Sequence, residues 1–274
     1  MPISALLLAL AAAVVHATWN LLLSGRKDTH SASAVAIVVG ALVFLPVALI
    51  GWRFDSAAVP FVAASSSLEL IYLVLLATAY SVAAMGFVYP IARGSAPVLV
   101  LIAGALVTGT RVSLLAGSGV LLVAAGIMLV RGVRRSARPR DLALALSVGV
   151  CIASYTLVDK HGITHANPVA YLELVFSLTA VVYLLGVWRV KGGAALRAGV
   201  SWKTALAGVG FFGSYALTLA ALRLAPAASV AAVRESSVVM AAAVLAIGGR
   251  EELGPGRFAG AVAVVAGIAL ISLG

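Results

Sequence analysis

The chain has 274 residues, of which 63% are hydrophobic and only 10% are charged, whereas soluble domains are about half apolar and a quarter charged. This composition excludes a water-soluble globule, and ten spans of about 20 residues each would leave no room for a separate soluble domain. A formal net charge of +10 would suggest nucleic acid for a soluble chain, but the charges lie between apolar runs, so we expect a lipid bilayer as partner and no nucleic acid.

The apolar runs predict ten transmembrane helices, and therefore an all-α polytopic protein of the inner or plasma membrane. The first run could also be a secretory signal, but residues 1–4 carry no basic side chain, so we interpret it as a span. The run from Ser65 to Thr108 is too long for one crossing and requires a turn near residues 81–84. The predicted spans are residues 3–23, 33–52, 66–82, 85–108, 113–131, 141–158, 168–188, 203–223, 226–248 and 254–273.

The two halves of the chain share a pattern that predicts an internal repeat. Residues 116–130 align with residues 257–271 at an offset of 141, and the same offset pairs Arg93 with Arg234. Because five helices per half is an odd number, the second half must cross the membrane in the opposite sense, which gives the inverted repeat of many secondary transporters. The predicted units are a five-helix repeat over 1–132, a basic linker over 133–140 and a second five-helix repeat over 141–274.

Motifs in the first, fourth and ninth predicted spans carry a resemblance to a known family. They are His16-Ala17-Thr18-Trp19-Asn20, the segment from Tyr89 to Pro97, and the segment from Arg234 to Val239. With them the sequence resembles the ten-helix branch of the drug/metabolite transporter superfamily, which has paired EamA-type domains. The resemblance covers nearly the whole chain. It implies export or uptake of small organic solutes, driven by an ion gradient or by exchange.

Arg93 and Arg234 lie about eight residues into their predicted spans, near the bilayer midplane. A charge there costs at least about 2.5–3.5 kcal/mol, so each arginine needs a partner or an aqueous cavity. Two interpretations stay open. Each arginine could be a structural brace beside an acid or a helix C-terminus, or the pair could line a central cavity and attract an anionic, carboxylate-bearing substrate.

Glu173 and Glu235 are the two carboxylates that lie well inside predicted spans, whereas Glu69 lies nearer to an end. Acids in such surroundings are candidates for proton coupling, and a fixed ion pair to one of the arginines is the alternative. Neighbours in sequence do not share a helix face, so Glu235 is not the natural partner of Arg234. We favour Glu235 as the acid that gives up its proton when substrate binds, which would produce proton–substrate antiport.

One face of the first predicted helix carries His16, Trp19 and Asn20, at positions i, i+3 and i+4. The matched positions in the sixth span include Tyr155 and Thr156, so both halves offer an aromatic and a hydrogen-bonding side chain at similar depth. We favour substrate binding for this face. The alternative is interhelical packing, because polar residues also hold membrane helices together.

Two further patterns are interpreted as structural features of a membrane protein. Tyr80 and Tyr215 are expected in the interfacial aromatic belt, with a place in the cavity as the alternative. Ala259, Ala263 and Gly267 recur at a spacing of four, which predicts a small-residue ridge for close helix approach.

The sequence carries no signature of a cofactor site. Gly109-Thr110 and Gly248-Gly249-Arg250 lack the ending of a phosphate loop, so we expect no nucleotide-driven transport. His161 and His165 lie four apart in a predicted loop, where we expect no metal, and the lone Cys151 permits no intrachain disulfide. We therefore expect no enzyme activity, no cofactor, and a monomer or weak homodimer.

The basic residues favour one orientation. Apart from Arg93 and Arg234, the odd-numbered loops hold 13 lysines and arginines and the even-numbered loops hold four. The positive-inside rule then predicts cytoplasmic odd loops and both termini outside, whereas the family resemblance implies both termini inside. We follow the charge distribution.

These patterns together predict a secondary-active transporter of a small organic metabolite, with export as the favoured direction. It would alternate its access around a midplane cavity, and a proton is the candidate coupling ion. The alternatives are a lipid-carrier flippase on the same scaffold and a membrane accessory protein that transports nothing.

Overall fold

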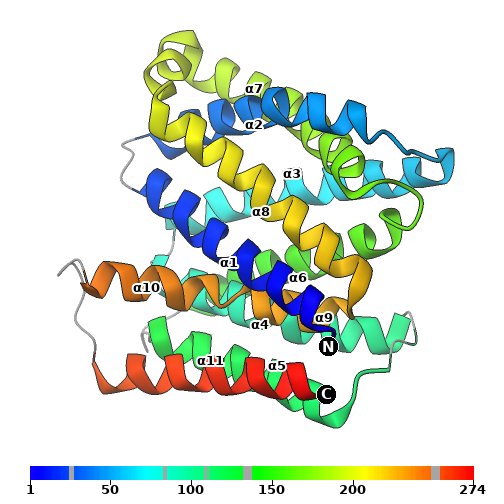
Figure 1. Ribbon diagram of the computed structural model, residues 1–274. Helices are drawn as coiled ribbons and strands as arrows, with labels where there is room; N and C mark the ends of the chain where they lie inside the picture. Colours follow the sequence, from blue (N-terminus) through cyan, green and yellow to red (C-terminus); the bar gives the residue numbers. More distant parts are fainter. Residues whose placement is uncertain (25–27, 83–84, 108, 110, 132–137, 248–253) are drawn as a thin grey trace.

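The computed structural model describes residues 1–274 except 25–27, 83–84, 108, 110, 132–137 and 248–253. Helices run across one bundle in alternating directions, with the N- and C-termini at the same end (Figure 1). The elements are α1 (Ile3–Ser24), α2 (Thr29–Ile50), the 3-10 helix η1 (Ser56–Ala58), α3 (Val59–Val82), α4 (Met85–Val107), α5 (Leu114–Arg131), α6 (Pro139–Gly162), α7 (Pro168–Gly199), α8 (Trp202–Leu224), α9 (Ala227–Arg234), α10 (Ser237–Ile247) and α11 (Pro255–Leu273).

The described helices confirm an all-α polytopic membrane protein. Nine segments are long and apolar enough to cross a bilayer, one of them made of α9 and α10 together, and the apolar part of α5 is shorter. Many large hydrophobic side chains point outward, Ile50 and Leu114 being 90% and 94% exposed, as lipid-facing residues are. The ten predicted spans each correspond to one of these segments.

Three helix boundaries differ from the sequence prediction. Asp55 caps η1 by accepting a hydrogen bond from the backbone N–H of Ala57 at 2.9 Å, and α3 follows directly, so the third helix begins at Val59 and not at residue 66. Glu69 therefore lies well inside its helix, where the prediction placed it nearer to an end. In the same way α6 extends to Gly162, beyond the predicted end at residue 158.

The third difference is the length of α7, which runs 11 residues past the predicted end at residue 188 to Gly199. A kink at Gly192, with φ of 77° and ψ of 168°, separates its last turns from the membrane-crossing part, and glycine adopts this φ without steric penalty. Residues 83–84 of the predicted turn, most of the predicted basic linker and the glycine-rich stretch at residues 248–250 lie outside the described part of the chain.

Contacts between the halves follow the pattern of two related five-helix units. Helix α1 packs on α8, and their counterparts α6 and α3 pack on each other; α2 packs on its counterpart α7, and α5 packs on its counterpart α11. In Figure 1, α5 and α11 run side by side at one edge of the bundle. This exchange of partners is what a pseudo-twofold relation requires, and the bounds of the two repeat units stay a prediction.

Glycines bring α5 and α11 together. A Cβ at Gly119 would lie 2.6 Å from the carbonyl oxygen of Gly267, and a Cβ at Gly126 would lie 2.7 Å from that of Gly260. Gly119 and Gly126 are the repeat counterparts of Gly260 and Gly267, so the contact is the same in both directions. The predicted ridge is confirmed at Gly267, which makes one of these contacts, and wrong at Ala259, which is exposed; the other close contact is at Gly260.

Both ends of the bundle have contacts that join the two halves. The face with the termini, called here the terminal face, has a bridge between the loops after α2 and α6: the N–H of Asp55 donates to the carbonyl oxygen of His165 at 2.9 Å, and that of Asn167 to Arg53 at 2.7 Å. At the opposite face, Lys191 donates to Asp28 at 2.6 Å and holds the pKa of that carboxyl down at about 2.

Candidate functional site

Arg93 occupies the centre of the candidate site, between Pro90 and Pro97 of α4. Its guanidinium is buried, and Nη1 donates to the two carboxylate oxygens of Glu235 at 3.1 and 3.4 Å. Nη2 lies 3.2 Å from Nε2 of His16. A guanidinium can only donate, so this imidazole nitrogen accepts and His16 is neutral. Arg93 thus links α1 of the first half to the second half.

Arg234, the repeat counterpart of Arg93, is the last residue of α9 and is 7% exposed. Within the described part of the chain the salt bridges are Arg93–Glu235 and Asp28–Lys191, so no carboxylate lies within 4.0 Å of the Arg234 guanidinium. Its Cζ lies 5.7 Å from the ring centroid of Tyr215. Arg234 is therefore a buried cation that lies near an aromatic ring and has no carboxylate within salt-bridge distance among the described residues.

The ninth span is broken where this arginine lies. Helix α9 ends at Arg234 and α10 begins at Ser237. Between them Glu235 keeps an αR conformation and the N–H of Ser236 donates to Val233, so one tight turn interrupts the helix without unwinding it. The hydroxyls of Ser236 and Ser237 are buried without a hydrogen-bond partner, and so is the indole Nε1 of Trp19. Broken helices near the midplane form the binding sites of several transporter folds. These three atoms could therefore bind a ligand.

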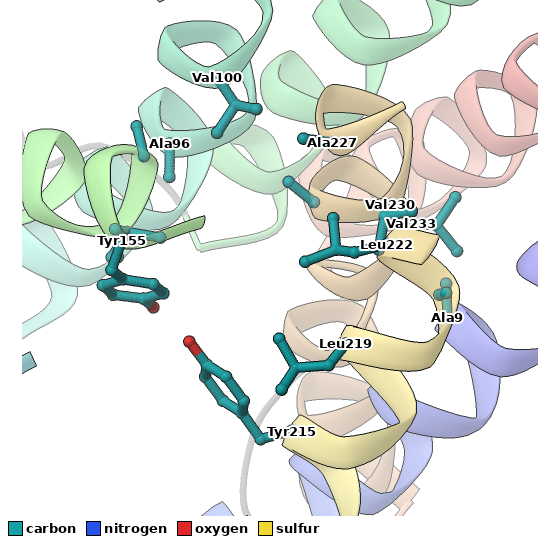
Figure 2. Close-up of a cluster of buried hydrophobic side chains, with 14 of the residues drawn as sticks. Ala9, Ala96, Val100, Tyr155, Tyr215, Leu219, Leu222, Ala227, Val230 and Val233 are labelled. Atoms are coloured by element: carbon teal, nitrogen blue, oxygen red, sulfur yellow. The ribbon is translucent and has the colours of Figure 1, made fainter. Parts of the chain in front are cut away.

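Aromatic rings from both halves pack beside Arg234. The ring of Trp19 contacts Phe211, Phe211 contacts Phe176, and Phe176 contacts Tyr215, with centroids 5.3, 4.8 and 4.9 Å apart. Tyr155 lies 6.3 Å from Tyr215, and Figure 2 shows the two hydroxyls directed toward each other. Tyr215 is 6% exposed, so its prediction as an interfacial belt residue was wrong.

Two buried carboxyls that the sequence interpretation did not use meet at Tyr215. Its hydroxyl lies 3.3 Å from Oε1 of Glu69 in α3 and makes a short contact with Oδ2 of Asp159 in α6. The hydroxyl of Tyr171 donates to the other oxygen of Asp159 at 3.0 Å. Glu69 and Asp159 are 4% and 1% exposed. The structure thus places an acidic pair next to the unpaired arginine.

A sequence signal for this pair existed. Tyr155 and Asp159 are separated by four residues, which puts both on one face of α6, as Glu69 and Tyr72 are on one face of α3. The signal was missed because Asp159 lies one residue beyond the predicted end of its span.

The predicted site residues do not all meet. His16, Arg93 and Glu235 form one bonded group, and Trp19, Tyr155 and Arg234 join it through ring contacts and the broken helix. The other two predicted residues stay apart. Asn20 donates to the carbonyl oxygen of His16 on its own helix at 2.9 Å, and Glu173 accepts from Ser177 at 2.9 Å while its second oxygen is buried and unpartnered.

A polar cavity of about 590 Å³ lies over the loop bridge at the terminal face, with Arg53, Asp55, His165 and Arg223 among its lining residues. The rings of His161 and His165 stack on Phe61, with centroids 6.4 and 5.8 Å away. In the described part of the chain, no three histidine, cysteine, aspartate or glutamate residues gather as metal ligands would.

The comparisons with known proteins agree with this architecture. Residues 141–273 match the model of the EamA-like transporter family, and no curated protein matches the chain. One solved crystal structure, titled only as that of a protein, aligns over 100% of this chain and 98% of the chain in that structure, with a TM-score of 0.81 and 16% sequence identity. This likeness shows a shared fold. The second half of this multi-pass membrane chain, residues 141–273, therefore belongs to the EamA-like transporter family of the drug/metabolite transporter superfamily, which supports a transporter-like role in the membrane.

Proposed function

We propose that the protein is a secondary-active transporter that carries a small organic anion across the membrane by alternating access, and that Arg234 binds the anionic group. The observation that carries this proposal is the burial of Arg234 without a carboxylate partner among the described residues. A charge near the midplane costs at least about 2.5–3.5 kcal/mol. A bound carboxylate would offset that cost through bidentate, charge-assisted hydrogen bonds.

The two arginines support different roles although the repeat makes them equivalent. Arg93 is neutralised by Glu235 at 3.1 Å, which favours the structural brace for this residue. Arg234 has no such partner and lies at the helix break, next to the unpartnered hydroxyls of Ser236 and Ser237. Unsatisfied buried polar groups are costly, so their presence favours a ligand that completes their hydrogen bonds.

The contacts at the two faces support alternating access. The loop bridge at the terminal face and the Asp28–Lys191 ion pair at the opposite face each join one repeat to the other. Each could open while the other stays closed if the repeats rock about the central site, as inverted-repeat transporters do. The substrate would then leave by whichever face is open.

The first test is binding to purified protein in detergent. We expect acetate, benzoate or succinate to raise the melting temperature, and we expect acetamide, benzamide and succinamide to have no effect. The variant Arg234→Gln should lose the response. The variant Arg223→Gln, which removes an exposed arginine at the terminal face, should keep it.

The second test is counterflow of labelled acetate, benzoate and succinate in proteoliposomes. Wild type and Arg223→Gln should exchange the anion that stabilises the protein, and Arg234→Gln should not. If only neutral or cationic compounds bind, or if Arg234→Gln binds the anions as well as wild type does, the assignment of Arg234 is wrong.

A further inference from the structure

The hydroxyl of Tyr215 lies between two buried carboxyls, and this geometry sets their protonation. The oxygen is within hydrogen-bonding distance of both Glu69 and Asp159. A tyrosine hydroxyl carries one proton, so it can donate to one carboxylate only. The second contact is a hydrogen bond only if the second carboxyl carries a proton and donates it to the tyrosine oxygen. The pair therefore holds one proton in this conformation.

The balance of buried charge leads to the same count independently. Arg93 and Glu235 neutralise each other, and His16 is neutral because it accepts from Arg93. The remaining cation is Arg234, which lies over the Tyr215 ring. If both Glu69 and Asp159 were ionised, the group would carry one excess negative charge, whereas one proton on the pair makes it neutral, as burial favours.

The titratable and charged groups around Glu69 and Asp159 come from several helices. The cations with the largest electrostatic effect on Glu69 and Asp159 are arginines, so Arg234 is the main cation available to them after Arg93 is paired. The groups are Tyr72 of α3, Arg93 of α4, Tyr155 of α6, Tyr171 of α7, Tyr215 of α8 and Arg234 of α9.

We propose that Glu69, Tyr215 and Asp159 form the proton-binding site of the transporter, and that an anion bound at Arg234 increases its affinity for a further proton. The second part rests on the proposed function. An anion that pairs with Arg234 leaves the remaining carboxylate without its cation. That carboxylate then binds a proton from the water at the open face, and the proton is released with the anion at the other face.

The direction of coupling follows from this competition for Arg234. Because anion and proton bind together, the two are carried in the same direction with no net charge moved. This differs from the antiport through Glu235 that the sequence favoured. Glu235 is held by Arg93 in a buried pair at 3.1 Å, which leaves the Glu69–Asp159 pair as the titratable group that faces Arg234.

The shared proton is tested by infrared difference spectroscopy of the substrate-free protein in lipid nanodiscs, through the C=O band of a protonated carboxyl. The difference spectrum of wild type between two pH values should contain this band. Glu69→Gln and Asp159→Asn should each remove it, because the one remaining acid then ionises beside Arg234. Glu173→Gln serves as the control and should leave it. If either single variant keeps the band, or wild type lacks it, the shared proton is refuted.

Tyr215→Phe provides a second measurement that retains both acids, in case the other variants do not fold. The band should persist at a shifted frequency because the hydroxyl bond is lost. An unchanged frequency would show that the hydroxyl is not bound to the protonated carboxyl.

The coupling is tested with acetate and a pH indicator in weakly buffered solution. Wild type should take up about one proton per acetate bound, and the double variant Glu69→Gln/Asp159→Asn, in which neither member of the pair can take up a proton, should bind acetate without uptake. If acetate binds to wild type without proton uptake, the coupling is refuted while the anion site stands. If acetate does not bind at all, the anion site is refuted, and the infrared result still decides on the shared proton.

Discussion

Breaking the Arg93–Glu235 pair should separate the structural arginine from the binding arginine. The change is Glu235→Gln, which leaves the Arg93 guanidinium buried and without a counter-ion; it cannot lose its charge, because arginine does not deprotonate in proteins. The matched change is Arg234→Met, which removes a buried cation that has no ion-pair partner among the described residues. We expect the first variant to be unstable and the second to be stable and inactive.

The size of the effect follows from the geometry. At 3.1 Å and an effective dielectric constant of about 20, the attraction between the two charges is about 5 kcal/mol before desolvation is subtracted. Removing one partner of a buried pair costs about 3–5 kcal/mol, so Glu235→Gln should lose about that much. In Arg234→Met, the gain of about 2.5–3.5 kcal/mol from removing a midplane charge should nearly offset the lost side-chain packing.

The assay is the free energy of unfolding in mixed micelles, measured for Glu235→Gln, Arg93→Met, Glu235→Met, the double variant Arg93→Met/Glu235→Met and Arg234→Met. Replacement of both partners of a buried pair by apolar residues is often neutral, so the double variant should recover most of the loss, with a coupling energy of about 2–3 kcal/mol. Additive losses in this cycle would show that the pair is not a brace. A loss in Arg234→Met as large as that in Glu235→Met would assign the structural role to both arginines.

Three further predictions concern packing, pH and orientation. Gly126→Ala puts a Cβ 2.7 Å from the Gly260 oxygen and should destabilise the protein by about 1–3 kcal/mol. Gly117→Ala meets nothing within 4 Å and should gain up to about 1 kcal/mol from helix propensity. Equal melting temperatures for the two variants would contradict the close packing of α5 on α11. The Asp28 pKa of about 2 lies below its usual value of 3.8. The pair with Lys191 is about a third exposed and should stabilise the folded protein by about 0–1 kcal/mol above about pH 4. This contribution should be lost as pH falls toward 2. Wild type and Asp28→Asn should therefore converge in melting temperature at low pH or high salt, and parallel profiles would argue against the pair. A reporter fused to the C-terminus should be active outside the cytoplasm, and activity only in the cytoplasm would reverse the orientation predicted from the loop charges.

The fold class and the approximate position of each span could be predicted from the sequence alone. Hydrophobic runs and their lengths are local properties, and a bilayer leaves few alternatives to helices for such runs. The two intramembrane arginines could be found in the same way, because a charge at the midplane is conspicuous in the sequence. Helix ends were less accurate, since they depend on local caps such as Asp55 and on the kink at Gly192.

Which polar groups meet could not be predicted from the sequence, because it depends on how the helices pack. Arg93 and Glu235 are 142 residues apart, and their pairing depends on how α4 and the broken ninth span are rotated toward each other. The same holds for Glu69 and Asp159, which come from α3 and α6 and share a hydroxyl from α8. The sequence repeat predicts a similar depth for Arg93 and Arg234, but Glu235 can form a salt bridge with only one of them. In the structure this is Arg93, and among the described residues no carboxylate lies within 4.0 Å of Arg234.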